Sequence, residues 1–308
     1  MKNIPRFMHD SKKKALLLTA ALLLYLFVSP ALAPAKEVVV IKDIEIKPYR
    51  DAIEGFKSAC GCVVRELELS DAGALEEAVE ARPDAVVAVG TEAFRKVKTI
   101  KNIPVIYIMV MPSEADASAL SADNVSGVSM DIAPETYLTA IAGLFPGAKR
   151  IGVLSDPAHT GLFVQEAAAV ARGWGIGLVV KTIRDPRQVP VFLDELRDNV
   201  DVLWMLPDST LVNPDTVNYL MLFSFQHDLP VFSFSKRYVS LGAVAALNIN
   251  PYDMGAQAGE IARRVTHGGK GPIRSYAKHP RLIVNRKVAA KMGVEINNEV
   301  AGHAETIE

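Results

Sequence analysis

The stretch Asp84-Ala85-Val86-Val87-Ala88-Val89-Gly90-Thr91 decides the fold class of this chain. A strand without a polar residue is buried on both faces, which is typical of a parallel sheet covered by helices on both sides. The Gly-Thr pair that follows is typical of a turn into a helix, because a small or hydroxyl residue suits a helix start. The stretch therefore predicts one β-α unit of an α/β protein.

Similar apolar strands alternate with amphipathic helices on both sides of this unit. Before and after it, strands are predicted at 38–41, 62–64 and 104–110, and helices at 49–59, 73–81 and from 91. The alternation restarts after residue 123, with strands at 124–130, 151–154, 177–181, 202–206 and 229–234 and helices from 134 and at 161–173, 186–197 and 214–227. Two successive α/β halves of this size predict two doubly wound parallel-sheet lobes.

The remaining strands (243–248 and 282–284) and helices (254–265 and 287–292) are too few for a third domain. We expect them to return to the two lobes, so that several chain segments form the hinge. The first lobe is expected to comprise residues 36–123 plus about 249–272, and the second 124–248 plus about 273–296. Residues 297–308 are expected to form a tail.

The N-terminus predicts export. Five basic residues and one acid precede residue 15, and Ala15–Val28 is an apolar run broken only by Thr19. Such a run is shorter than the roughly 20 residues of a membrane span and fits a secretory signal peptide. We expect cleavage after Ala35 and a periplasmic or otherwise extracytoplasmic protein; an uncleaved anchor is the alternative.

Charge and cysteine content exclude several classes. Without residues 1–35 the chain has 29 basic and 34 acidic residues, a formal charge of −5. This charge disfavours binding to nucleic acid or anionic lipid. The two cysteines, Cys60 and Cys62, flank Gly61. We expect them to lie unbridged around a helix end, since a bridge across one residue closes a small, strained ring.

Catalytic signatures are absent from the sequence. It has no nucleophile elbow, Walker loop or HExxH motif, and its six histidines lack metal-ligand spacing. We therefore expect no enzyme, no metal site and no cofactor.

Hydroxyl and acidic residues follow several predicted strands. Thr91, Ser209 or Thr210, and Ser235 each stand between a strand and a helix. In open α/β sheets, ligands bind at the carboxyl ends of the strands, where helix N-termini offer free N–H groups. These side chains are candidates for holding a polar ligand, although simple N-capping of the helices explains each of them equally well.

Longer motifs point to a family. The first two motifs are Asn124-Val125-Ser126-Gly127-Val128-Ser129 and Leu144-Phe145-Pro146-Gly147-Ala148-Lys149-Arg150-Ile151-Gly152-Val153-Leu154. Three shorter motifs follow them: Leu206-Pro207-Asp208-Ser209, Leu229-Pro230-Val231-Phe232-Ser233 and Leu282-Ile283-Val284-Asn285. In this order and spacing they resemble the ABC-transporter substrate-binding family, which has the type I periplasmic-binding-protein fold. The resemblance extends over about residues 36–296.

The resemblance implies a small-molecule receptor, with amino acids among the ligands of the family. It implies ligand-binding roles for Thr91 and Glu92 on the first-lobe wall and for Ser129 near the first crossover between the lobes. It also implies such roles for Asp208 and Ser209 on the second-lobe wall and for Ser235 and Asn248 near the later loops. Asp208 is the candidate partner for a ligand ammonium group. The loop after the first strand departs from the family pattern, and Asp43 in it is a further candidate for that contact.

We therefore expect a monomeric, extracytoplasmic solute-binding protein that closes its two lobes on a small polar ligand, an amino acid or a related molecule. An inner-membrane ABC permease is its expected partner. The alternatives are a periplasmic sensor that signals to a membrane receptor and, more remotely, an extracytoplasmic enzyme whose residues meet only in the fold.

Overall fold

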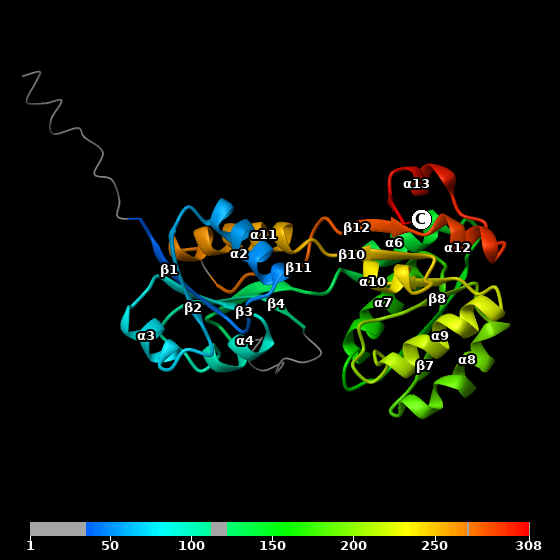
Figure 1. Cartoon of the computed structure of the whole chain (residues 1–308), viewed down its shortest axis with the longest axis horizontal. Coiled ribbons are helices and arrows are strands. Elements are labelled where there is room, and N and C mark those ends of the chain that lie inside the picture. Colours follow the sequence, from blue (N-terminus) through cyan, green and yellow to red (C-terminus); the bar gives the residue numbers. More distant parts are fainter. Residues whose placement is uncertain (1–34, 112–121, 270, 308) are drawn as a thin grey trace, which may run out of the picture. The chain divides into compact units, whose positions relative to one another are not determined.

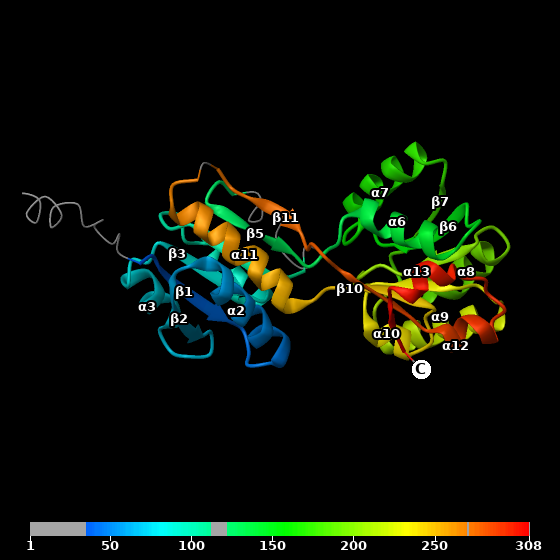
Figure 2. The same cartoon turned by 90° about the horizontal axis from the view of Figure 1, so that it is seen from above.

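The computed structural model describes residues 35–111, 122–269 and 271–307, which form two α/β lobes, each built around its own sheet (Figures 1 and 2). The expected signal peptide, apart from Ala35, lies outside the described residues. Within the described ranges, no helix combines the length and apolar character needed to cross a membrane.

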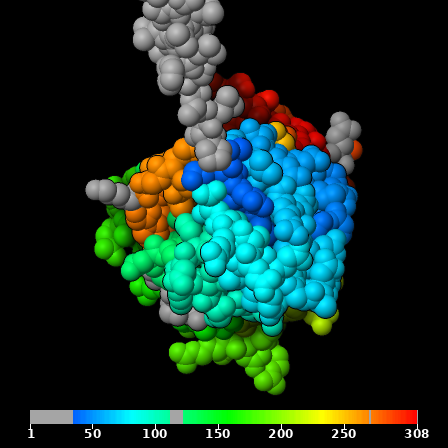
Figure 3. Space-filling view, turned by 90° about the vertical axis from the view of Figure 1, so that its left-hand side faces the viewer, coloured from blue at the N-terminus to red at the C-terminus, as the bar shows by residue number. Residues whose placement is uncertain are grey.

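The first lobe has a six-stranded sheet in the order β11-β5-β4-β3-β1-β2, and every pairing in it is parallel. Its strands are β1 (Glu37–Lys42), β2 (Val63–Glu68), β3 (Ala85–Val89), β4 (Val105–Val110), β5 (Val125–Ser129) and β11 (Arg274–Tyr276). Its helices are α2 (Lys47–Cys60), α3 (Ala74–Glu80), α4 (Thr91–Val97) and α11 (Pro251–Thr266). Early and late parts of the sequence thus share one surface of this lobe, blue to cyan and orange in Figure 3.

Alternate residues of the first-lobe strands pack into two hydrophobic cores, one on each face of the sheet. Val38 and Val40 of β1 pack with α2 and α11, whereas Val39 and Ile41 pack with α3 and α4 on the opposite face. All four are completely buried. This double burial explains the continuous apolar strands seen in the sequence.

Helices α2 and α11 approach each other through glycine. A Cβ atom added at Gly255 would lie 1.8 Å from the carbonyl oxygen of Ala52, and one at Gly55 would lie 1.9 Å from that of Tyr252. The two backbones are therefore in contact without an intervening side chain. Figures 1 and 2 both show the helices side by side.

The second lobe has a seven-stranded sheet in the order β13-β12-β10-β9-β8-β6-β7, parallel except between β10 and β12. Its strands are β6 (Arg150–Ser155), β7 (Gly177–Thr182), β8 (Val202–Trp204), β9 (Val231–Ser233), β10 (Ala245–Asn248), β12 (Arg281–Val284) and β13 (Glu305–Thr306). Its helices are α6 (Pro134–Leu144), α7 (Gly161–Gly173), α8 (Val189–Arg197), α9 (Pro214–Gln226), α10 (Lys236–Ser240), α12 (Arg286–Lys291) and α13 (Asn298–Gly302), with a 3-10 turn at Pro186–Gln188.

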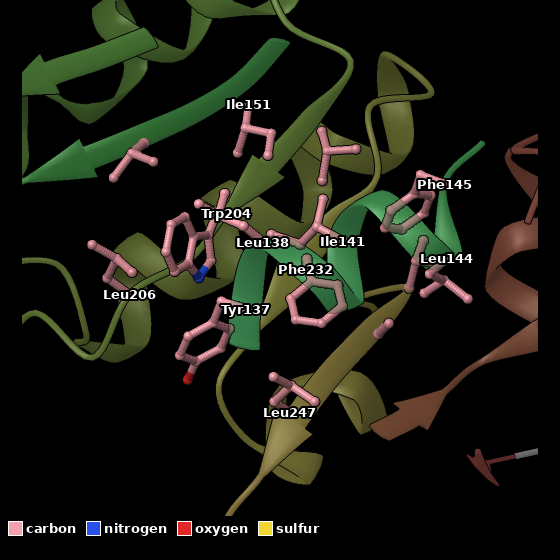
Figure 4. Close-up of a cluster of buried hydrophobic side chains, with 14 of the residues drawn as sticks. Tyr137, Leu138, Ile141, Leu144, Phe145, Ile151, Trp204, Leu206, Phe232 and Leu247 are labelled. Carbon is pink, nitrogen blue, oxygen red and sulfur yellow. The ribbon is translucent and has the colours of Figure 1, made fainter. Parts of the chain in front are cut away.

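Two cores again cover the two faces of this sheet. Trp204 and Phe232 pack with Tyr137, Leu138 and other residues of α6 and with α7 (Figure 4). On the other face, residues of β6, β8 and β9 pack with α8 and α9. The doubly wound architecture expected from the sequence is thus present in both lobes.

Several expected boundaries were wrong. Strand β5 pairs with β4, and β11 pairs with β5, so both belong to the first sheet rather than to the second lobe. The expected tail instead contains α13, and β13 extends the second sheet beside β12. The chain therefore passes between the sheets three times, at residues 130–133, 249–250 and 277–280.

The expectation for the cysteines was also wrong, because Cys60 and Cys62 form a disulfide. Gly61 ends α2 with a φ of 62°, the left-handed turn that the sequence indicated. This turn brings the Cα atoms of the two cysteines to 5.3 Å, within the range of about 4.4–6.8 Å that disulfides require. Strand β2 then begins at Val63.

Candidate ligand-binding site

The predicted site residues lie at the carboxyl edges of the two sheets. Asp43, Thr91, Glu92 and Ser129 follow or end strands of the first sheet, and Asp208, Ser209, Thr210, Ser235 and Asn248 do so in the second. The structure therefore places them in two groups, one on each lobe. Each group is described by itself below.

In the first lobe, Asp43 binds the start of α4. Its carboxylate accepts hydrogen bonds from the backbone N–H groups of Glu92, at 3.0 Å, and Ala93. Burial raises the pKa of the Asp43 carboxyl, while these two N–H groups act in the opposite direction. A side chain at Gly90, whose φ is 102°, would collide with Asp43. Asp43 is thus fixed against the first turn of α4.

The other first-lobe candidates lie close to strand ends. Thr91 opens α4 and is partly exposed, and the side chain of Glu92 pairs with Arg95. The Ser129 hydroxyl is buried and accepts a hydrogen bond from the N–H of Asp131 at 3.0 Å. Ser129 thereby shapes the segment that leaves the first sheet.

In the second lobe, Asp208 is completely buried. Its Oδ2 accepts hydrogen bonds from the Asp156 N–H at 2.7 Å and the Thr160 hydroxyl at 2.6 Å, and its Oδ1 accepts one from the Thr210 N–H at 3.0 Å. The Thr210 hydroxyl donates to Asp156 at 2.7 Å. Asp208 therefore ties together the loops after β6 and β8.

The remaining second-lobe candidates have different surroundings. Ser235 accepts a hydrogen bond from the N–H of Arg237 at 3.3 Å, and Asn248 accepts one from the N–H of Lys236 at 3.1 Å, so both cap α10. The capping alternative that the sequence left open for Ser235 thus describes its contact in this structure. Ser209 is exposed. Direct ligand contacts by any of these residues stay a prediction.

Sequence reasoning missed Asp131, which lies two residues beyond the end of β5. Its side chain is partly buried, and desolvation raises the pKa of the carboxyl group to about 6 despite a hydrogen bond from Ser129. Among the residues described, no lysine, arginine or histidine forms an ion pair with it. The available signal was an acidic residue just after a buried strand. Its apolar neighbours Met130 and Ile132 made this position look like part of the apolar strand.

Sequence reasoning also missed an aromatic cluster beside the carboxyl end of β8, made of Tyr137, Phe163 and Trp204. The ring centroids of Trp204 lie 5.0 Å from Tyr137 and 5.6 Å from Phe163. The indole Nε1 of Trp204 is buried without a hydrogen-bond partner in the described part of the chain. Figure 4 shows this nitrogen on the side of the indole that faces Tyr137.

The cluster adjoins the start of α7. Phe163 lies in the first turn of this helix, and Thr160 is its N-cap residue. The Thr160 hydroxyl binds Ser155 and Asp208 and makes no capping hydrogen bond. The first N–H groups of α7 are thus left without a side-chain cap, and such groups favour a negative charge.

These edges offer hydroxyls, carboxylates, amides and aromatic rings. Across the described ranges, no group of three or more histidine, cysteine, aspartate or glutamate residues is placed to hold a metal ion. The arrangement is suited to non-covalent recognition of a small polar molecule with an apolar part.

Two of the similar proteins are described as binding proteins. A tyrosine-binding protein of Clostridioides difficile is 26% identical over 246 residues, which cover 78% of this chain and 70% of the relative. The chain is also similar in structure to a ligand-free, open substrate-binding protein with adhesive properties from Clostridium difficile, with a TM-score of 0.71 and 19% identity over 89% of this chain and 99% of the other.

Two further structures share the fold. One is an ABC domain in complex with L-Trp from Streptococcus pneumoniae, with a TM-score of 0.59 and 19% identity over 89% of this chain and 100% of the other. The other is a periplasmic ribose ABC transporter protein from Conexibacter woesei, with a TM-score of 0.52 and 18% identity over 85% and 95% of the two chains.

The family model for ABC transporter substrate binding proteins matches residues 68–307, most of the chain. The two lobes have the type I periplasmic-binding-protein fold that the sequence motifs implied. The chain therefore belongs to the ABC transporter substrate-binding protein family.

Proposed function

We propose that this protein is the extracytoplasmic receptor of an ABC importer and that it binds a free amino acid with an aromatic side chain. The observation that carries the proposal is Asp131, a partly buried and desolvated carboxyl group without a basic partner in the described residues, close in sequence to Tyr137 of the aromatic cluster. The names of the relatives, which refer to tyrosine and L-Trp, support the same ligand class.

Asp131 supplies the ammonium contact in this proposal. A carboxylate that is removed from water without gaining a cationic partner is destabilised in its ionised form. The pKa of Asp131 is therefore raised, to about 6. A bound ammonium group removes this destabilisation by supplying the missing positive charge. Asp208, the sequence candidate for this contact, is satisfied by three donors from its own lobe and acts in our proposal as a positioning residue.

The ligand carboxylate is assigned to the first turn of α7. The uncapped N–H groups there carry the positive end of the helix dipole, which attracts an anion. Phe163 in the same turn is partly exposed and offers an aromatic surface to the ligand side chain. The aromatic preference follows from this surface together with Tyr137 and Trp204.

Binding requires no covalent step. Ligand contacts from both lobes favour the closed arrangement over the open one, so that ligand shifts the population toward closure. A permease that recognises the closed form then accepts the ligand. The basic and apolar N-terminus, expected to be a cleaved signal peptide, would place the protein on the outer side of the membrane.

Calorimetric titration of residues 36–308 tests the proposal. L-tyrosine, L-tryptophan and L-phenylalanine are compared with the analogues of tyrosine that lack either the ammonium or the carboxylate group. We expect the intact amino acids to bind and each analogue to bind more weakly by about 1.5–3 kcal/mol, since each loses a charged contact. Absence of binding by any amino acid, or equal binding of the analogue without the ammonium group, overturns the proposal.

The matched variants are Asp131→Asn and Asp123→Asn. Asp131→Asn should weaken amino-acid binding about 10- to 150-fold, whereas Asp123 is exposed in the loop before β5 and its substitution should leave affinity unchanged. Uptake of labelled ligand by cells with and without the gene then separates an importer from a sensor.

A further inference from the structure

We propose that the outward face of α9 is a self-association surface through which two copies of this chain pair antiparallel, in place of the monomer expected from the sequence. The inward residues of α9, including Val217, Leu220 and Met221, are buried in the second-lobe core. On the outward face, Tyr219, Leu222 and Phe225 are 38%, 55% and 49% exposed. We refer to these three residues as the α9 stripe; Figure 1 shows α9 beside α8 on the second lobe.

The outward face lacks the charged residues that normally cover a surface helix. No aspartate, glutamate, lysine or arginine occurs between Asp215 and Asp228. A surface helix ordinarily alternates an apolar stripe with a charged face, and a helix that is apolar on both sides is usually covered on both. Something of apolar character is therefore expected to cover the α9 stripe.

The sequence of α9 is chemically symmetric about Leu222. Three residues away on either side are the aromatic residues Tyr219 and Phe225, and four residues away are the exposed amides Asn218 and Gln226. At about 100° per residue, all four lie within about 60° of Leu222 around the helix. The symmetric set therefore occupies one face.

This symmetry selects a second copy of the chain as the occupant. A two-fold axis through Leu222 places Tyr219 against Phe225 of the second copy and Asn218 against its Gln226, so each contact occurs twice. Aromatic pairs and amide pairs are both favourable. The antiparallel arrangement also brings the positive end of each helix dipole near the negative end of the other.

The surface next to Tyr219 is hollowed to receive such a partner. A groove between the starts of α8 and α9 is lined by Pro186, Arg187, Pro190, Asn213, Asp215 and Tyr219. In the antiparallel pair, the end of the second α9 with its Phe225 lies over the start of the first. The groove then accommodates the Phe225 ring, as close packing at an interface core requires.

The proposal is tested by sedimentation of residues 36–308 at protein concentrations from about 1 µM to 1 mM. Dissociation constants in this range correspond to association free energies of about −8.2 to −4.1 kcal/mol. We expect a reversible monomer–dimer equilibrium that Leu222→Glu weakens by about tenfold or more, because a carboxylate is buried without a partner. The control is Leu162→Glu, the same substitution at a leucine of α7 that is 79% exposed. A wild type that stays monomeric throughout, or equal effects of the two variants, overturns the proposal.

Cross-linking tests the two-fold axis. Leu222→Cys should form a disulfide-linked dimer under mild oxidation, since the axis places the two residues 222 together, whereas Leu162→Cys should not. Equal cross-linking of both variants overturns the antiparallel pairing. Binding of a monomeric wild type to phosphatidylcholine vesicles, lost in Leu222→Glu, would show that a lipid surface rather than a second copy covers the stripe and would equally overturn it.

Discussion

The carboxylate of Asp208 and the hydroxyl of Thr160 are joined by a 2.6 Å hydrogen bond between the loops that follow β8 and β6. Both residues are buried. Since the same carboxylate also holds the N–H groups of Asp156 and Thr210, it fixes the loops of the second-lobe edge relative to each other. The edge that we assign to ligand binding is therefore preorganised from within its own lobe.

We predict that Asp208→Asn destabilises the protein by about 1–3 kcal/mol, because an amide donor replaces an acceptor oxygen in a buried network. Denaturant unfolding measures the change, and Ser209→Ala, at the exposed neighbour, is the control and should have little effect. If Asp208→Asn kept full stability but lost ligand affinity, the direct ammonium contact suggested by the sequence would be correct instead.

The contact between α2 and α11 gives a second prediction. Gly255→Ala places a Cβ atom 1.8 Å from the Ala52 carbonyl oxygen, and neither backbone has a flexible group that can move aside. The unfolding free energy should fall by about 3 kcal/mol, the upper end of overpacking costs.

Gly143→Ala in α6 is the matched control for the helix contact. Its new Cβ would meet only Val300, at 3.9 Å, so alanine's helix propensity should stabilise by up to about 1 kcal/mol. Comparable destabilisation by both substitutions would show that helix packing at Gly255 is looser than described.

Asp131 makes stability and binding depend on pH in opposite ways. Its pKa is raised from 3.8 to about 6, so the ionised carboxylate costs folding stability above pH 6, and that cost disappears as the pH falls toward 4. Asp131→Asn should therefore stabilise the ligand-free protein at pH 8, on the order of 1–3 kcal/mol, and have little effect at pH 4. Thermal unfolding at the two pH values measures the difference.

Amino-acid affinity of the wild type should decrease below about pH 6, because the protonated Asp131 no longer attracts an ammonium group. Titration calorimetry across this range checks the expectation. An Asp131→Asn protein that loses stability at pH 8, or a wild type whose affinity is constant between pH 5 and pH 8, would contradict the assigned environment of this carboxyl group.

The disulfide between Cys60 and Cys62 should contribute little to stability. A loop of three residues restricts the unfolded chain only slightly, which corresponds to about 1.6 kcal/mol at most. We predict that reduction exposes two thiols to alkylation, seen by mass spectrometry, and shifts the denaturant midpoint modestly. A loss several times larger would indicate that the bridge also fixes the end of α2.

The sequence predicted the elements with strong periodicity and missed those that depend on distant partners. Strands such as β3 and β4 are apolar throughout and could be located directly. Strand β11 and strand β13 are short and largely unburied, and only their neighbours β5 and β12 define them. For that reason the lobe boundaries could not be derived from local pattern.

The site was predictable in location but not in contacts. Strand ends marked where polar residues gather, yet a carboxylate at a strand end can face its own lobe or a ligand, and sequence cannot distinguish these cases. Asp208 faces inward and holds loops, whereas Asp131 is partly buried without a cation partner in the described residues. The direction of a side chain depends on packing that no local pattern encodes.

The three passages between the sheets have a consequence for the order in which the chain becomes complete. Strand β11 and helix α11, which finish the first lobe, come after the second-lobe strands β6 to β10 and before the second-lobe strands β12 and β13. A growing chain that ends before residue 276 lacks the edge strand of its first sheet, and one that ends before residue 251 also lacks the helix that covers α2. The lobe that begins first therefore finishes late, and neither lobe can be excised as one continuous fragment.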